Sequence, residues 1–128
     1  MENKDIVFYY FSLTGNTKKI ADKLSDIFPS REIIPDLKVD KKFILISSSI
    51  NFGKVPIEVQ NFLKVNNKNL IAVIGSGNRT WGYNYCGAAK SIAKDYDVKY
   101  LGSIELAGTQ LAIKELKESI NEWLKDAF

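Results

Sequence analysis

The chain has 128 residues, 45% of them apolar and 26% charged, a balance typical of one folded globular domain. It contains no histidine and one cysteine, Cys86, which excludes imidazole-based catalytic triads, histidine-ligated metals, internal disulfides and thiolate zinc clusters. Its net charge of +3 is too small to indicate nucleic-acid binding, and the lack of long apolar runs or a secretory signal predicts a cytoplasmic protein with no membrane partner.

The first half of the chain reads as strand, helix, strand, strand and helix. Residues 6–11 form an unbroken β-branched and aromatic run, which predicts a buried strand. Apolar residues at helical spacing predict a helix over residues 17–28. Further strands are predicted at residues 31–35 and 43–47, with a loop between them in place of a helix. Pro56 then opens the next helix, because proline is well tolerated in a first turn.

The second half alternates in the same way, and it predicts an α/β fold. Strands are expected at residues 70–74 and 98–106, with helices at 87–96 and 109–124. Strands this apolar are expected when helices cover both faces of a parallel sheet. Right-handed crossovers then give a three-layer, doubly wound sandwich, and five strands favour the flavodoxin-like order 2-1-3-4-5. We expect residues 1–128 to form this one domain.

Ligands of such sheets bind at the carboxyl ends of the strands, close to the switch between strands one and three. The loop after the first strand, loop one (residues 12–17, Ser-Leu-Thr-Gly-Asn-Thr), carries hydroxyls, an amide and a glycine and runs into a helix. A helix N-terminus with such donors favours an anion. Because the loop has neither a Walker nor a Gly-x-Gly-x-x-Gly pattern, it predicts a single phosphomonoester. The alternative is that Ser12 or Thr14 only caps the helix.

Two further loops carry the features of a site for a flat ligand. Loop two (residues 47–56) contains three serines, Phe52 and Gly53, and loop three (residues 75–85) contains three glycines, one tryptophan and two tyrosines. Such aromatics in a loop indicate that they cover something. The alternatives are a turn with Phe52 in the core, and an apolar patch beneath loop three. One ligand satisfies all three loops: flavin mononucleotide (FMN), with its phosphate on loop one and its ring between loops two and three.

Four segments together resemble a known family. They are residues 10–17 (YFSLTGNT), 51–56 (NFGKVP), 72–82 (AVIGSGNRTWG) and 105–109 (ELAGT). The first is shared by flavodoxins generally, whereas the other three, in this order, are specific to NrdI. NrdI is the flavodoxin-like activator family of class Ib ribonucleotide reductase. The resemblance covers nearly the whole chain.

The resemblance implies an FMN protein that takes electrons from a donor and, once reduced, reacts with O2. The superoxide or peroxide produced goes to the dimanganese small subunit of the reductase, NrdF, for assembly of its radical cofactor. The flavin would carry the chemistry, with no catalytic side chain and no metal in this chain. The implied cofactor-binding residues are Ser12, Leu13, Thr14, Gly15, Asn16 and Thr17 in loop one, Ser48, Ser49, Asn51, Phe52 and Gly53 in loop two, and Gly77, Asn78, Trp81 and Gly82 in loop three.

Two other readings remain open. A general one-electron-transfer flavodoxin would use the same cofactor, but residues 51–100 hold seven basic and three acidic residues, which favours a ligand or partner of negative charge. A phosphoacceptor module of the same topology would need an aspartate after the third strand, where Ser47, Ser48 and Ser49 stand instead.

Many NrdI proteins have a tyrosine in the run that is Ser47, Ser48 and Ser49 here, so the resemblance implies an altered environment for the flavin ring. Cys86 is expected to be a small packing residue.

Overall fold

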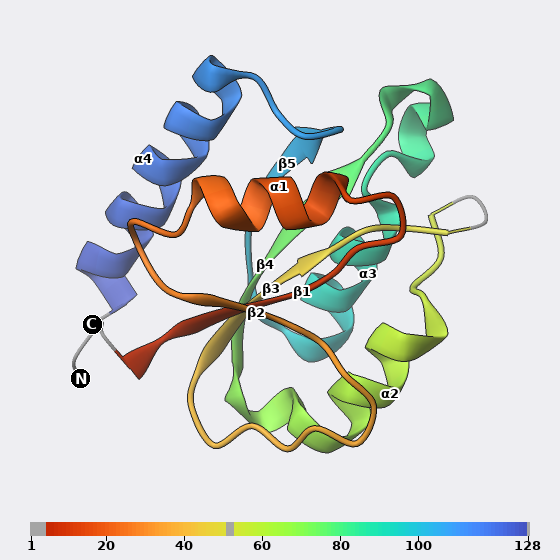
Figure 1. The fold of residues 1–128 in the computed structure, drawn as a ribbon, viewed down its shortest axis with the longest axis vertical. Helices are drawn as coiled ribbons and strands as arrows, with labels where there is room; N and C mark the ends of the chain where they lie inside the picture. The colour runs from red at the N-terminus through yellow and green to blue at the C-terminus, as the bar shows by residue number, and fades with distance from the viewer. Residues whose placement is uncertain (1–4, 51–52, 128) are drawn as a thin grey trace.

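A parallel β-sheet forms the centre of the molecule (Figure 1). The computed structural model describes residues 5–50 and 53–127. The strands are β1 (Val7–Phe11), β2 (Ser30–Glu32), β3 (Phe43–Ser47), β4 (Leu70–Gly77) and β5 (Lys99–Glu105). They pair in parallel in the order β2-β1-β3-β4-β5. The predicted five-stranded, flavodoxin-like order is therefore confirmed.

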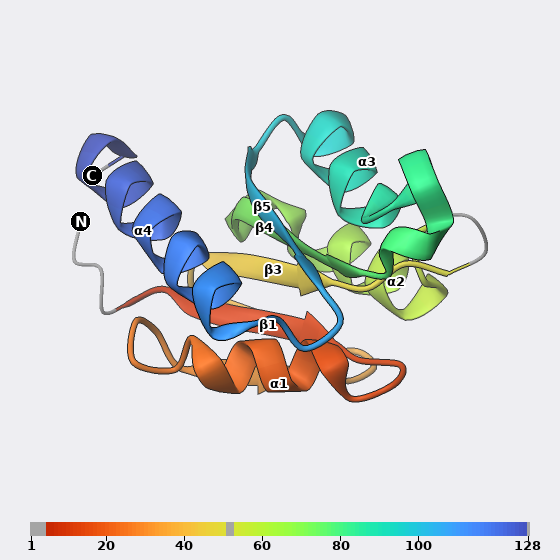
Figure 2. The same cartoon turned by 90° about the horizontal axis from the view of Figure 1, so that it is seen from above.

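Helices cover both faces of this sheet, as Figure 2 shows. The helices α1 (Asn16–Lys23) and α4 (Gln110–Ala127) pack on one face, and α2 (Ile57–Asn66) and α3 (Gly87–Tyr96) pack on the other. Two short 3-10 helices, η2 (Asn67–Asn69) and η3 (Arg79–Asn84), precede and follow β4. No described helix is both long enough and apolar enough to cross a bilayer.

Alternation along the strands divides the core into two apolar layers. In β1, Phe8 points into the layer shared with α1 and α4, and Tyr9 points into the layer shared with α2 and α3. Tyr9 packs against Phe43 and Phe62, with ring centroids 5.6 and 5.4 Å apart. Each such aromatic pair contributes about 1 kcal/mol beyond simple burial. Because both faces of the central strands are buried, their sequences are apolar without alternation.

Two elements in the first half are shorter than their patterns predict. Helix α1 ends at Lys23, although the apolar spacing continues to residue 28. The Ser25 hydroxyl donates to the Asp22 carbonyl at 2.7 Å, and such side-chain bonds compete with the helical pattern. Phe28 is buried all the same. Strand β2 ends at Glu32 because its neighbour β1 pairs with it only from Phe8 to Tyr10.

Strand β4 is longer than predicted, and this matters for the site. It continues through Gly75, Ser76 and Gly77, residues whose composition predicts a loop. Pairing with β5 as far as Glu105 holds this segment extended. Loop three therefore leaves the sheet at Asn78, three residues later than predicted. The expected loop in place of a helix between β2 and β3 is present, since residues 33–42 contain no helical segment.

Candidate functional site

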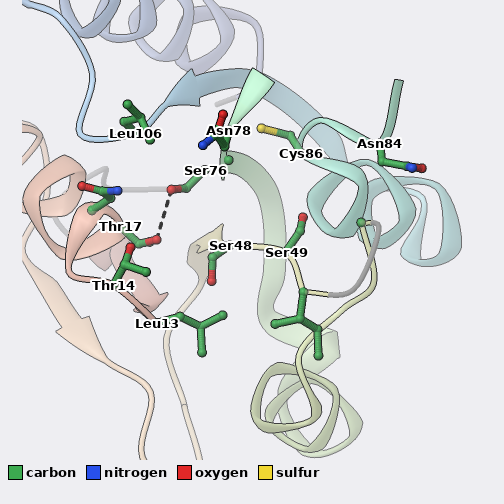
Figure 3. Close-up of a pocket in the computed structure, with 14 residues that line it drawn as sticks. Leu13, Thr14, Thr17, Ser48, Ser49, Ser76, Asn78, Asn84, Cys86 and Leu106 are labelled. Carbon is green, nitrogen blue, oxygen red and sulfur yellow. Dashed lines mark hydrogen bonds between the residues drawn. The ribbon is translucent and has the colours of Figure 1, made fainter. Parts of the chain in front are cut away.

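The carboxyl ends of the central strands lie side by side and open into a cavity. In the sheet register, Phe11 of β1 is opposite Ser47 of β3, and Ser47 is opposite Gly75 of β4. The chain segments that follow these strands border a cavity of about 320 Å3. This volume is at the lower end of the range of small-molecule sites, roughly 300–1,000 Å3. Figure 3 shows the side chains that line it.

Most of the predicted site residues meet at this cavity. The predicted residues that line it are Leu13, Thr14, Asn16, Thr17, Ser48, Ser49, Gly53, Gly77 and Asn78. Ser12, Gly15 and Gly82 are not lining residues. Asn51 and Phe52 lie outside the described residues, as does the side chain of Trp81. The lining also includes Ile50, Ser76, Asn84, Cys86 and Leu106, which the sequence analysis does not assign to the site.

Loop one delivers an uncapped helix end to the cavity. The Gly15 N–H donates to the Ser12 hydroxyl at 2.9 Å, which closes a tight turn just before α1. Gly15 has φ +92°, a conformation that favours glycine. No side chain caps α1, so the alternative in which Ser12 or Thr14 is merely its cap does not hold. The first-turn N–H groups of this helix are therefore left for a ligand or for solvent.

Two buried hydroxyls join α1 to β4 on the cavity wall. Thr17 is 2% exposed and Ser76 is 3% exposed. The Thr17 hydroxyl donates to the Ser76 hydroxyl at 3.1 Å (Figure 3). Because a hydroxyl has one proton, this arrangement leaves the Ser76 proton for another acceptor. The wall thus combines a buried donor with the free N–H groups of α1.

Loop two is held at several points. The Ser48 hydroxyl donates to the Phe11 carbonyl at 3.3 Å, and the Ser49 hydroxyl accepts from the Ala88 N–H at 3.0 Å. Ile50 and Lys54 exchange two backbone hydrogen bonds, Ile50 N–H to Lys54 O at 2.9 Å and Lys54 N–H to Ile50 O at 2.6 Å. These contacts join the residues just before Ile50 to β1 and α3, and they join Ile50 to Lys54.

Cys86 forms the part of the lining that lies over β4. It is 1% exposed and has φ +56°. Gly75 and Gly77 make room for it, because a Cβ on Gly75 would lie 2.7 Å from the Cys86 Cβ and one on Gly77 would lie 3.2 Å from its Sγ. Burial raises the pKa of the Cys86 thiol, which keeps it neutral near pH 7. This supports the expected packing role.

Leu106 is a lining residue from the segment after β5. Its N–H donates to the Gly77 carbonyl at 2.8 Å, and it has φ +55°, which is uncommon for a branched residue. Leu106 and Leu13 are each about half exposed, at 48% and 52%. Strained backbone at Cys86 and Leu106, together with exposed apolar side chains, is typical of a ligand site.

The cavity itself is uncharged, and its surroundings are basic. None of the described lining residues is ionisable except Cys86, which burial keeps neutral. Lys54 and Arg79 directly follow the lining residues Gly53 and Asn78, and both are exposed. The Arg79 guanidinium and the Lys90 ammonium lie 5.6 and 5.7 Å from the centre of the Tyr85 ring. Glu105 partly balances this charge, because one of its carboxylate oxygens lies 3.9 Å from the Arg79 Nε and the other accepts from the Arg79 backbone N–H at 3.1 Å.

This arrangement is suited to binding rather than to acid–base chemistry. Within the described residues no group of three or more acidic or cysteine side chains is placed to hold a metal ion. The carboxylates of Asp95, Asp97, Glu115, Glu118 and Glu122 are exposed. A planar, mostly neutral ligand with one anionic group fits an uncharged cavity whose wall includes a free helix N-terminus.

The buried thiol predicts a loss of stability in alkali. Cys86 titrates in the unfolded chain near its ordinary pKa of 9.0, whereas burial raises this pKa in the folded protein. Above pH 9 the unfolded state therefore binds fewer protons, and the free energy of unfolding falls as pH rises. We expect the free energy of unfolding to fall more between pH 9 and 10 in the wild type than in Cys86→Ala. Urea unfolding of the wild type and of Cys86→Ala measures it, and parallel pH profiles of the two proteins would contradict it.

Comparison with solved structures finds the same fold in flavodoxins. A short-chain flavodoxin associated with a bacterial microcompartment is 17% identical, with a TM-score of 0.72 over 96% of this chain and 98% of that one. A flavodoxin of Streptococcus pneumoniae TIGR4 is 20% identical, with a TM-score of 0.71 over 95% and 99%. A Fusobacterium nucleatum flavodoxin bound to flavin mononucleotide is 20% identical, with a TM-score of 0.64 over 94% and 97%. At these identities the likeness establishes the fold alone.

Comparison with protein families is more specific. The family model for NrdI flavodoxin-like proteins matches residues 8–118 of this chain. The match runs from β1 into α4 and so includes every segment that borders the cavity. The chain therefore belongs to the NrdI flavodoxin-like family.

Proposed function

We propose that this protein binds FMN and, in its reduced form, supplies superoxide or peroxide to the dimanganese small subunit of a class Ib ribonucleotide reductase. The observation that carries the proposal is the uncharged cavity beside the uncapped N-terminus of α1. A monophosphate is the group that such a helix end favours, and an uncharged, partly apolar wall suits a flavin ring. Membership of the NrdI flavodoxin-like family supports the same cofactor and partner.

In this proposal each of the three loops contacts a different part of FMN. Loop one holds the phosphate through the α1 N–H groups and the Thr14 hydroxyl, while Ser76 offers its free proton beside them. Loops two and three border the ring, and Leu13 and Leu106 shield it from solvent at the mouth of the cavity. When bound, FMN supplies the electron transfer to O2. The protein needs no ionisable catalytic group of its own, and residues 1–128 form the one FMN-binding domain that does this.

The basic rim supports a negatively charged partner surface. Three exposed basic residues lie near the cavity lining. Lys54 and Arg79 directly follow the lining residues Gly53 and Asn78, and Lys90 of α3 lies by the ring of Tyr85. Positive charge at this edge speeds association with an acidic surface and fixes its orientation. We propose that the reductase small subunit docks over this rim, which brings it to the place where the oxidant is released.

Activation of a metal-loaded small subunit tests the proposal. The purified protein is saturated with FMN, desalted, reduced without O2 and mixed with a dimanganese class Ib small subunit before oxygen is added. We expect the radical signal of the subunit to appear only when FMN, prior reduction and O2 are all present. FMN-free protein and an unrelated reduced flavodoxin serve as controls.

Three results of these experiments would contradict all or part of the proposed function. Protein that takes up no FMN would contradict the whole proposal. Protein that takes up FMN and exchanges electrons with a reductase, but activates no more subunit than the unrelated flavodoxin, would be a general one-electron carrier. Activation that is insensitive to salt would contradict the docking role of Lys54, Arg79 and Lys90, because screening weakens attraction between exposed charges.

A further inference from the structure

Loop two meets the start of α3 through two glycines. A Cβ on Gly87 would lie 2.9 Å from both the Cα and the carbonyl oxygen of Gly53. A Cβ on Gly53 would in turn lie 3.3 Å from the Gly87 Cα and 3.0 Å from the Asn84 carbonyl oxygen. Distances under 3.0 Å are shorter than real Cβ contacts, so the two backbones touch only because neither residue carries a side chain.

The reason for glycine differs between the two positions. Gly53 has φ +90°, so its conformation alone favours glycine. Gly87 is the first residue of α3 and is not among the residues with positive φ. Alanine is preferred over glycine in helices, so the backbone of α3 gives no reason for glycine at this position. The close approach of the Gly53 backbone is therefore what requires glycine at position 87.

The contact acts on the part of loop two that lines the cavity. Gly53 is a lining residue, whereas Gly87 is not. The same two segments are also joined by the bond from the Ala88 N–H to the Ser49 hydroxyl, and Figure 3 shows Ser49 at the cavity wall. Lys54 follows Gly53 directly, and its two hydrogen bonds to Ile50 carry a displacement of Gly53 to that lining residue. A residue outside the site thus sets how close this turn lies to α3.

We infer that Gly87 is a positioning residue that fixes the Ile50–Lys54 turn against the cofactor cavity. A methyl group at position 87 pushes Gly53 away from α3, and closely packed backbone cannot absorb such a shift without moving the turn. The inference rests on the proposed FMN function for its effect on cofactor binding. Its effect on the turn itself is independent of any ligand.

Gly87→Ala tests the inference, with Ser91→Ala as the matched control. Ser91 is an exposed residue of the same helix that borders a groove with Gly53 and Lys54, but its replacement only removes an oxygen atom and so adds nothing that could displace Gly53. We expect Gly87→Ala to raise the Kd for FMN about tenfold and to shift the midpoint potential of the bound flavin. In FMN-free protein, we expect hydrogen exchange at the Ile50 and Lys54 amides to become about tenfold faster. Ser91→Ala should change none of these quantities.

A second variant covers the case in which Gly87→Ala does not fold. Ser49→Ala removes the hydrogen bond to the Ala88 N–H without adding an atom, and it too should speed exchange at Ile50 and Lys54. Exchange rates equal to wild type in every folded variant would overturn the inference, whatever the protein binds. Wild-type protein that binds no FMN, combined with faster exchange in the variants, would overturn the proposed function and leave the role of Gly87 intact.

Discussion

Riboflavin is expected to bind this protein roughly 100-fold more weakly than FMN, although both carry the same ring. The difference is the phosphate, which we place at the uncapped N-terminus of α1. Hydrogen bonds to a charged group contribute about 1.5–3 kcal/mol each, and every 1.4 kcal/mol is about tenfold in affinity. Quenching of flavin fluorescence in parallel titrations with the two ligands measures the ratio.

A hydroxyl variant of loop one provides the control. Thr14→Val keeps the shape of a lining side chain but removes its donor, so FMN should bind about tenfold more weakly while riboflavin is unaffected. Thr80 is an exposed residue of η3 that does not itself line the cavity, so Thr80→Val should change neither affinity. Equal affinities of the wild type for FMN and riboflavin would show that α1 does not bind the phosphate.

Gly75→Ala is expected to destabilise the protein by about 2 kcal/mol. A Cβ at this position would lie 2.7 Å from the Cys86 Cβ and 2.8 Å from the Tyr100 hydroxyl oxygen. Gly75 lies in β4 without a positive φ, so the loss comes from crowding rather than from backbone strain. Urea unfolding monitored by circular dichroism measures the free energy of unfolding.

The double variant Gly75→Ala with Cys86→Gly isolates the crowding. Removing the Cys86 side chain vacates the space that the new methyl group needs, and glycine suits the φ of +56° at this position. The double variant should therefore lose less stability than the two single changes together, with the Tyr100 contact accounting for the remaining loss. Strictly additive losses would mean that Cys86 does not pack on Gly75 as described.

The sequence predicts the sheet and its order well because apolar runs report burial directly. The run from Ile6 to Phe11 can be a strand only if both of its faces are covered, and this condition selects the three-layer fold. The ends of elements depend on contacts that a local pattern does not contain. Residues Gly75–Gly77 have the composition of a loop, yet pairing with β5 extends them as strand. Just after the end of α1, the Ser25 hydroxyl bonds to the Asp22 carbonyl and competes with an otherwise continuous helical pattern.

The candidate site is predictable to a similar extent and for a similar reason. Loops one, two and three converge because they leave parallel strands at the same edge of the sheet. Leu106 belongs to the ELAGT segment that supports the family resemblance, but nothing local indicates that it turns toward the cavity. That orientation depends on its hydrogen bond to Gly77. Cys86 is likewise placed by two glycines more than eight residues upstream.

The bare first turn of α1 has a consequence for the life of the protein in a cell. Under the proposed function, a phosphate bound at these N–H groups favours the folded state, so FMN occupancy and stability are linked. Protein made while riboflavin is scarce would then be degraded by proteases faster than FMN-bound protein. The abundance of this protein would then follow flavin supply without any dedicated regulator.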